Sequence, residues 1–215
     1  MSILQLCVCF IIGYIFGNIP NGYLYAKSQG VDIYHQGSGN PGSTNVLRTL
    51  GKRAGITVLL MDIAKCMVPI FLMILFWKPA NEDQKTLILM LTGIGAILGH
   101  NFPILPGVKG GKGVACTGAL LIALAPLYTL GLLCFFILIV LTTKYVSLGS
   151  VLSVFVFFLS VLLMGKSGIL FPFSKAVYLP MCGLSLFLAL LCLFQHRENM
   201  KRLMNGTENK FGKKK

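Results

Sequence analysis

Long apolar stretches dominate the chain, and each is long enough to cross a lipid bilayer as a helix. A spanning helix needs about 20 apolar residues to cross a hydrocarbon core of about 30 Å. The stretches run over residues 3–26, 55–77, 86–104, 146–164 and 176–195, with a further one at 113–142. Only 12% of the 215 residues are charged, whereas soluble domains are typically about 25% charged. We therefore expect one all-α integral membrane domain over residues 1–215.

The stretch at 113–142 decides the topology, because it is about thirty residues long and holds Pro126 near its middle. A single crossing puts the basic C-terminal tail and the basic loop at 27–53 on opposite sides of the membrane. A reversal at Pro126 puts both on the cytoplasmic side, where loops are rich in lysine and arginine. We therefore predict a seven-transmembrane-helix bundle with short or re-entrant helices around Pro126, the N-terminus outside and the C-terminus cytoplasmic.

The net charge of +13 fits this arrangement without a nucleic-acid partner, because the basic residues lie between and after the apolar stretches. The tail alone carries Arg197, Lys201, Arg202, Lys210, Lys213, Lys214 and Lys215. Only six carboxylates occur in the chain, so no metal and no cofactor is implied. Two GxxxG pairs, Gly13 with Gly17 and Gly95 with Gly99, indicate close helix packing. Asp62 and Lys65, one turn apart inside an apolar stretch, indicate a buried ion pair.

A run of small polar residues follows the first apolar stretch, from Gly37 to Arg48. Its glycines allow a backbone to approach a ligand closely. Its hydroxyl, amide and guanidinium groups are the donors that suit a phosphoryl group. We interpret it as a ligand-binding loop. A flexible turn that carries one cytoplasmic arginine is the simpler alternative.

A second motif comprises Gly99-His100-Asn101-Phe102-Pro103 and then Lys109-Gly110-Gly111-Lys112-Gly113-Val114. Two lysines and three glycines at the start of an apolar helix place backbone N–H groups and ammonium groups at a positive helix end, which favours anion binding. The pattern is not a Walker A loop, since neither serine nor threonine follows Lys112. Two interfacial lysines at a kinked helix entry are the alternative. We interpret His100 as a structural residue at a helix end, because a single histidine at such a position is more often hydrogen-bonded than catalytic.

A third motif begins at His196-Arg197-Glu198-Asn199 and continues to Gly206-Thr207-Glu208. On a continuing helix His196 and Asn199 share a face, and a histidine there can accept or orient a proton near neutral pH. The alternative is a solvated basic helix end. Ser147 falls on the same cytoplasmic side under the seven-helix topology.

Together, the three motifs resemble those of the acyl-phosphate:glycerol-3-phosphate acyltransferase family (PlsY type), and the resemblance covers nearly the whole chain. It implies transfer of a fatty acyl group from acyl phosphate to the 1-hydroxyl of glycerol 3-phosphate, giving 1-acylglycerol 3-phosphate (lysophosphatidate) and phosphate. It implies glycerol 3-phosphate, long-chain acyl phosphate and membrane lipids as partners, in the bacterial cytoplasmic membrane. Whether the chain also binds the soluble enzyme that supplies acyl phosphate stays open.

The residues that match the family motifs form the predicted site. We expect catalytic roles for His196, Asn199, Ser38 and Arg48, and substrate-binding roles for Asn45, Gly110, Gly111, Lys112, Gly113 and Ser147. Glu208 matches a family glutamate that we interpret as structural. Two other functions remain possible from the sequence: a transporter or channel for phosphorylated metabolites, and a lipid-binding scaffold. The clustering of polar motifs on one side argues against the first, and the glycine and serine spacing argues against the second.

Overall fold

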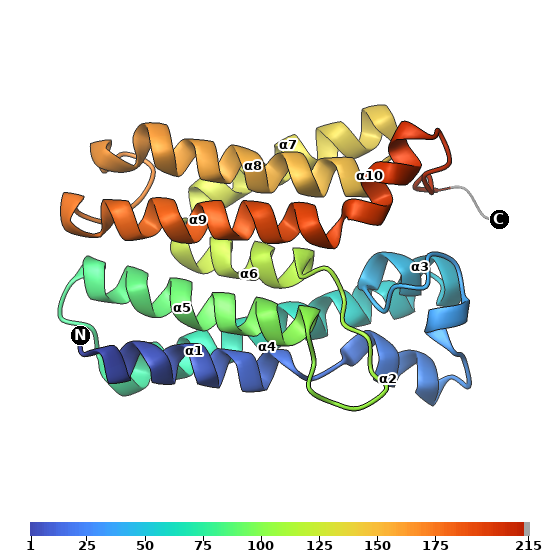
Figure 1. The fold of residues 1–215 in the computed structure, drawn as a ribbon, viewed down its shortest axis with the longest axis horizontal. Coiled ribbons are helices and arrows are strands. Elements are labelled where there is room, and N and C mark those ends of the chain that lie inside the picture. Colours follow the sequence, from blue (N-terminus) through green and yellow to red (C-terminus); the bar gives the residue numbers. More distant parts are fainter. Residues whose placement is uncertain (213–215) are drawn as a thin grey trace. The chain divides into compact units, whose positions relative to one another are not determined.

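The computed structural model describes residues 1–212, and within them every regular element is a helix (Figure 1), which confirms the all-α class. Lys213, Lys214 and Lys215 of the basic tail lie outside the described residues. The helices are α1 (Ile3–Gly17), α2 (Asn21–Ser28), α3 (Ser43–Leu50), α4 (Lys52–Trp77), α5 (Glu82–Asn101), α6 (Val114–Leu124), α7 (Pro126–Thr143), α8 (Val146–Met164), α9 (Lys175–Gln195), α10 (Arg197–Met204) and the short 3₁₀ helices η1 (Ile33–His35) and η2 (Gly165–Ser167).

Within the described chain, five helical segments are long and apolar enough to span a membrane, so the protein is a multi-pass membrane protein. They are Ile3–Ser28, Lys52–Trp77, Pro126–Thr143, Val146–Ser167 and Lys175–Gln195. The apolar helix α6 has 11 residues, which is short for a full crossing. Seven crossings, and the sides on which the termini lie, therefore stay predictions.

A helix break lies at the expected position around Pro126, while the reversal of the chain across the membrane at this point stays a prediction. Helix α6 ends at Leu124, and α7 begins at Pro126. Proline lacks the N–H that a helix interior requires, but at the first position of a helix that N–H has no partner to lose. The apolar stretch at 113–142 is consequently two helices.

The first apolar stretch differs from expectation, since it contains two helices where the sequence predicts one. Helix α1 ends at Gly17, and α2 starts at Asn21, directly after Pro20. The proline interrupts the backbone hydrogen bonds, and the Asn18 side chain donates to the carbonyl of Tyr14 at 2.7 Å. The break places polar asparagine side chains inside a segment that is otherwise apolar.

The described chain groups into two compact units, which we describe separately. The first comprises Met1–Pro79 and Leu87–Leu120, and the second comprises Ala80–Thr86 and the chain from Leu121 onward. In the first unit α3 and α1 each pack on α4, and in the second unit α7 packs on α8 and α8 on α9. The core of the second unit includes Phe157 and Phe171, which are fully buried and whose rings meet edge to face.

Glycines bring α1 and α5 into backbone contact within the first unit. A Cβ atom on Gly13 would lie 2.0 Å from the carbonyl oxygen of Thr92, and one on Gly95 would lie 2.1 Å from a carbonyl oxygen of α1. Gly17 and Gly99 leave equally little room for a side chain. The expected close packing at the two GxxxG pairs is confirmed.

Candidate active site

Asn45 organises the first polar motif from the start of α3. Its Oδ1 accepts from the backbone N–H of Ser38 at 2.8 Å, and its Nδ2 donates to the carbonyl of Gln36 at 2.9 Å. Arg48, one turn further along α3, donates to the same Oδ1 at 3.4 Å. The side chain of Asn45 is therefore a buried bridge that holds the two predicted catalytic residues, Ser38 and Arg48, on one local framework.

The glycine-rich motif forms a loop that lies on the carboxyl end of α5. The N–H of Gly111 donates to the carbonyl of His100 at 3.0 Å. A Cβ atom on Gly110 would meet the carbonyl of Asn101, and one on Gly111 would meet the ring of His100. Only glycine fits at these two positions, so the loop backbone itself rests against the helix end.

The same loop leads into the first turn of α6. Gly113 has a φ of +75°, in the left-handed region that glycine favours, and its carbonyl accepts from the N–H of Thr117 at 2.8 Å. Helix α6 therefore starts directly after Lys112 and Gly113, which puts the half-buried Lys112 beside a positive helix end. This arrangement favours an anion.

Tyr34 joins the first two motifs within the first unit. Its hydroxyl donates to the carbonyl of Lys109 at 3.1 Å and accepts from the N–H of Lys109 at 3.0 Å. Burial raises the pKa of the Tyr34 hydroxyl against the opposing effect of this backbone contact, so the group stays protonated and able to donate. Its ring stacks on that of Tyr23 at 5.6 Å between centroids.

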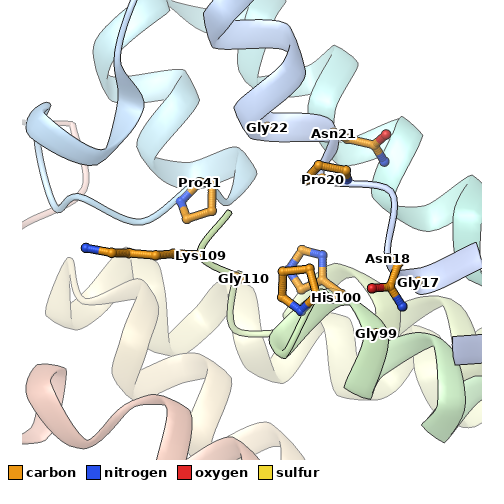
Figure 2. A pocket seen from close by; sticks show the side chains of 12 residues that line it. Gly17, Asn18, Pro20, Asn21, Gly22, Pro41, Gly99, His100, Lys109 and Gly110 are labelled. Atoms are coloured by element: carbon orange, nitrogen blue, oxygen red, sulfur yellow. The ribbon is translucent and has the colours of Figure 1, made fainter. Parts of the chain in front are cut away.

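A narrow pocket lies where the two motifs meet (Figure 2), with about 240 Å³ of empty space, part of it open solvent. His100 and the loop residue Gly110 line it together with Asn18 and Asn21 from the break in the first apolar stretch. The remaining lining residues are Gly17, Pro20, Gly22, Pro41, Gly99, Pro103, Lys109 and Gly111. The pocket therefore contains parts of both predicted motifs.

In the second unit, His196 is held in a defined tautomer at the junction of α9 and α10. Its Nδ1 lies 2.8 Å from the carbonyl oxygen of Cys192. A carbonyl only accepts, so the hydrogen of the neutral ring is on Nδ1 and the lone pair is on Nε2. This is the form that a general base requires. The residue is 2% exposed.

Glu208 connects the other predicted residues of the second unit. Its Oε1 accepts from Asn199 Nδ2 at 2.6 Å and from Ser147 Oγ at 2.9 Å. Its Oε2 accepts from Arg202 Nε at 2.7 Å. Burial raises the pKa of Glu208, but these three hydrogen bonds and the charge of Arg202 outweigh it and hold that pKa below its usual value. The contacts fit the structural role expected for Glu208.

The predicted site residues thus fall into two groups. Ser38, Asn45, Arg48 and the loop Gly110, Gly111, Lys112 and Gly113 belong to the first unit, and Ser147, His196 and Asn199 belong to the second. In the first group Asn45 joins Ser38 to Arg48, and in the second Glu208 joins Ser147 to Asn199. His196 lies three residues before Asn199 in the chain, and its contact given above is with Cys192.

Sequence reasoning assigned no role to the residues that hold the loop after α5. Asn18 Oδ1 accepts from the N–H of Ile104 at 2.7 Å, and the Tyr14 hydroxyl donates to the carbonyl of Phe102 at 2.8 Å. The available signal was Pro20, which marks the helix break that turns Asn18 toward this loop.

Comparison with known proteins gives one consistent result. A family model described as glycerol-3-phosphate acyltransferase matches residues 7–206. A curated glycerol-3-phosphate acyltransferase of Clostridioides difficile is 40% identical over the full length of both chains. That of Shouchella clausii is 42% identical, over 99% of this chain and 98% of the relative.

Two solved structures are similar over nearly the whole chain. Both are of PlsY (YgiH), an integral membrane glycerol 3-phosphate acyltransferase, and both are 32% identical to this chain. The glycerol 3-phosphate form has a TM-score of 0.81 and covers 96% of each chain. The lysophosphatidic acid form has a TM-score of 0.78 and covers 96% of this chain and 95% of the other.

Proposed function

The chain belongs to the glycerol-3-phosphate acyltransferase family of integral membrane enzymes, and we propose that its acyl donor is acyl phosphate. In this reaction the 1-hydroxyl of glycerol 3-phosphate attacks the acyl carbonyl. An ester bond forms, the bond from the acyl carbon to the phosphate oxygen breaks, and phosphate leaves. The products are 1-acylglycerol 3-phosphate and phosphate.

The glycine-rich loop at the start of α6 is the observation that carries this proposal. Both substrates have anionic phosphate heads, which repel each other and need positive partners. Lys112 with the N–H groups of Gly110 and Gly113 supplies one anion site, and Arg48 with Ser38 supplies further donors. These groups also stabilise the charge that develops on the leaving phosphate.

Acyl phosphate is a mixed anhydride and is already activated, so the reaction needs no covalent acyl-enzyme. Holding the hydroxyl against the carbonyl lowers the activation barrier by a proximity effect of several kcal/mol. Well-oriented reactants reach at most roughly 7–11 kcal/mol. His196 accepts the proton of the hydroxyl through Nε2, and Asn199 and Ser147 orient the polar head, with Asn45 keeping Ser38 and Arg48 in place. No cofactor or metal takes part in this scheme.

The proposed setting is the bacterial cytoplasmic membrane, with the site facing the cytoplasm. Glycerol 3-phosphate and phosphate are then exchanged with the cytoplasm, while the acyl chain of the donor and of the product remains among the membrane lipids. The soluble enzyme that makes acyl phosphate is a candidate partner at the same face.

The test is phosphate release by the purified protein in lipid, supplied with palmitoyl phosphate, with and without glycerol 3-phosphate. We expect release that depends on glycerol 3-phosphate and equals the lysophosphatidate formed. Release without that dependence, or none from folded protein, overturns the acyl-phosphate proposal. A protein that instead moves glycerol 3-phosphate across vesicle membranes is a transporter.

The variant Lys112→Ala tests the anion site in the same assay. Losing one charge-assisted contact worth about 1.5–3 kcal/mol should raise the KM for glycerol 3-phosphate by about 10- to 100-fold. Lys85→Ala is the matched control, because Lys85 is an exposed lysine in the first turn of α5 that pairs with Glu82. An unchanged KM in Lys112→Ala contradicts the assignment of this loop.

A further inference from the structure

A buried charged cluster lies beneath the glycine-rich loop, in the first unit and outside the predicted set of site residues. Asp62 Oδ1 accepts from Asn21 Nδ2 at 3.1 Å and lies 3.2 Å from Lys65 Nζ and 3.7 Å from His100 Nδ1. Lys65 also donates to the carbonyl of Ile19 at 2.7 Å. The side chains of Asp62 and Lys65 are 2% and 3% exposed.

Such a cluster is a poor way to gain stability alone. Removing two charges from water costs several kcal/mol for each ion, and well-packed apolar residues in place of a buried ion pair are often equally stable or more so. The cost is larger in a helix that spans a membrane. What the ion pair provides here is a fixed geometry among α2, α4 and α5, since a charge in a dry interior tolerates few arrangements of its partners.

His100 connects the ion pair to the glycine-rich loop. One side of the imidazole, at Nδ1, faces Asp62. The other side, at Nε2, faces Gly111, where a Cβ atom would lie 2.1 Å from that nitrogen. Figure 2 shows the ring beside Gly110 in the pocket. The orientation of this ring therefore sets where the backbone of Gly110 and Gly111 can rest.

The break in the first apolar stretch is tied to the same cluster. The carbonyl of Ile19, inside the break, accepts from Lys65, and Asn21 at the start of α2 donates to Asp62. Asn18, on the other side of Ile19, holds the loop through the N–H of Ile104. One ion pair in α4 thus fixes both the imidazole under the loop and the segment that anchors the beginning of the loop.

We propose that Asp62 and Lys65 are positioning residues that act through His100 to set the conformation of the loop Lys109–Gly113, and thereby the affinity for the phosphate head of the acceptor. The inference rests on the proposed function, because it assigns that head to this loop. Neither residue touches substrate in this scheme. The effect belongs in the KM for glycerol 3-phosphate and not in kcat.

The test uses the double variant Asp62→Asn, Lys65→Met, which removes both charges at nearly constant volume and leaves no bare charge in the interior. We expect the KM for glycerol 3-phosphate to rise about 10-fold or more, because small displacements of binding groups have effects of this order. The value of kcat and the KM for palmitoyl phosphate should stay close to those of the unchanged protein. Thr92→Val, at a buried hydroxyl of α5, is the control and should change none of the three.

The same double variant in a protein that also carries His100→Ala tests whether the ion pair acts through the imidazole. If the ion pair acts mainly through His100, the double variant should cause a smaller further rise in KM once His100→Ala is present, because only the contacts with Ile19 and Asn21 then remain to be lost. Additive effects of the two changes overturn the route. An unchanged KM in the folded double variant overturns the proposal, while glycerol 3-phosphate-dependent turnover by the unchanged protein keeps the proposed function. Absence of that turnover in the unchanged protein is failure of the proposed function itself.

Discussion

At the residue scale, amide and carboxylate side chains hold the candidate site together. Asn45 organises Ser38 and Arg48, and Glu208 organises Ser147 and Asn199. A group that reaches several partners at once fixes their relative positions more firmly than separate contacts do. Substitutions at such residues should therefore disturb function through geometry as well as through lost contacts.

Glu208→Gln should make stability less dependent on pH at the acidic end. The pKa of Glu208 lies below its ordinary value of 4.5 in the folded chain. A carboxyl with a lowered folded pKa stabilises the fold above its unfolded pKa and loses that contribution as the pH falls through the folded value. We expect the variant to unfold at a lower temperature at pH 7, and the difference to narrow below about pH 4.5.

Thermal unfolding in detergent between pH 3 and 8, with both proteins side by side, provides the measurement. Lys201 pairs with the exposed Glu198, so Glu198→Gln is the matched control and should show a small effect at every pH. A pH-independent difference between Glu208→Gln and the unchanged protein contradicts the prediction.

His196→Gln should lower kcat by about 10²–10⁴-fold, the usual contribution of a positioned general base. Glutamine cannot accept the proton, although it keeps a polar group at the position. His35→Gln is the control, because His35 is exposed and pairs with Asp32. Nearly full turnover by folded His196→Gln would show that the proton goes to another acceptor, such as the leaving phosphate.

At the scale of the element, substitution of glycine by alanine should have opposite effects on the unfolding temperature at a helix crossing and on an open helix face. Alanine favours a helix over glycine by about 1 kcal/mol. Gly131→Ala should therefore raise the unfolding temperature slightly, since a Cβ atom there meets nothing within 4 Å. Gly95→Ala should lower it, because its Cβ atom would press on the backbone of α1. Unfolding temperatures in detergent that shift equally and in the same direction in the two variants would contradict the close crossing of α1 and α5.

The two prolines show how much of the fold the sequence predicts. The break at Pro126 was predictable, because the surrounding stretch is too long for one crossing and too short for two ordinary ones. The break at Pro20 was missed, because the residues on both sides remain apolar and hydropathy does not record lost backbone hydrogen bonds.

Prediction of the site from the sequence is limited in the same way, because contacts that depend on the fold are not visible in the motifs. The motifs, with the family resemblance that they carry, predicted Ser38, Arg48, Lys112 and His196 as site residues. They did not predict that Ser147 donates to Glu208, 61 residues away, or that Tyr34 holds Lys109, 75 residues away. Contacts between residues so far apart in the sequence depend on tertiary packing, so the spacing of residues within a motif does not predict them.

At the scale of the whole molecule, the loop 102–113 decides between topologies. Crossing by both α5 and α6 puts this loop on the cytoplasmic side, whereas crossing by neither puts it outside. All other loops keep the same side in both cases, because the two helices form a pair. Reporter fusions in those loops therefore cannot distinguish seven crossings from five.

Leu105→Cys provides the measurement, because Leu105 is exposed in this loop. We expect a membrane-impermeant maleimide to label it in inside-out vesicles and to leave it unlabelled in right-side-out vesicles. The unchanged protein, with its native cysteines, gives the background. Labelling confined to right-side-out vesicles contradicts seven crossings and a cytoplasmic phosphate loop.

The ion pair in α4 also bears on how the chain enters the membrane during synthesis. A lone aspartate or lysine at the centre of an inserting helix costs about 2.5–3.5 kcal/mol. Asp62 and Lys65 lie three residues apart on one helix, so each enters the bilayer with its counterion already beside it, before α5 and His100 have been made. The helix carries its own charge compensation through the insertion machinery, and the later partners then give the pair its final orientation.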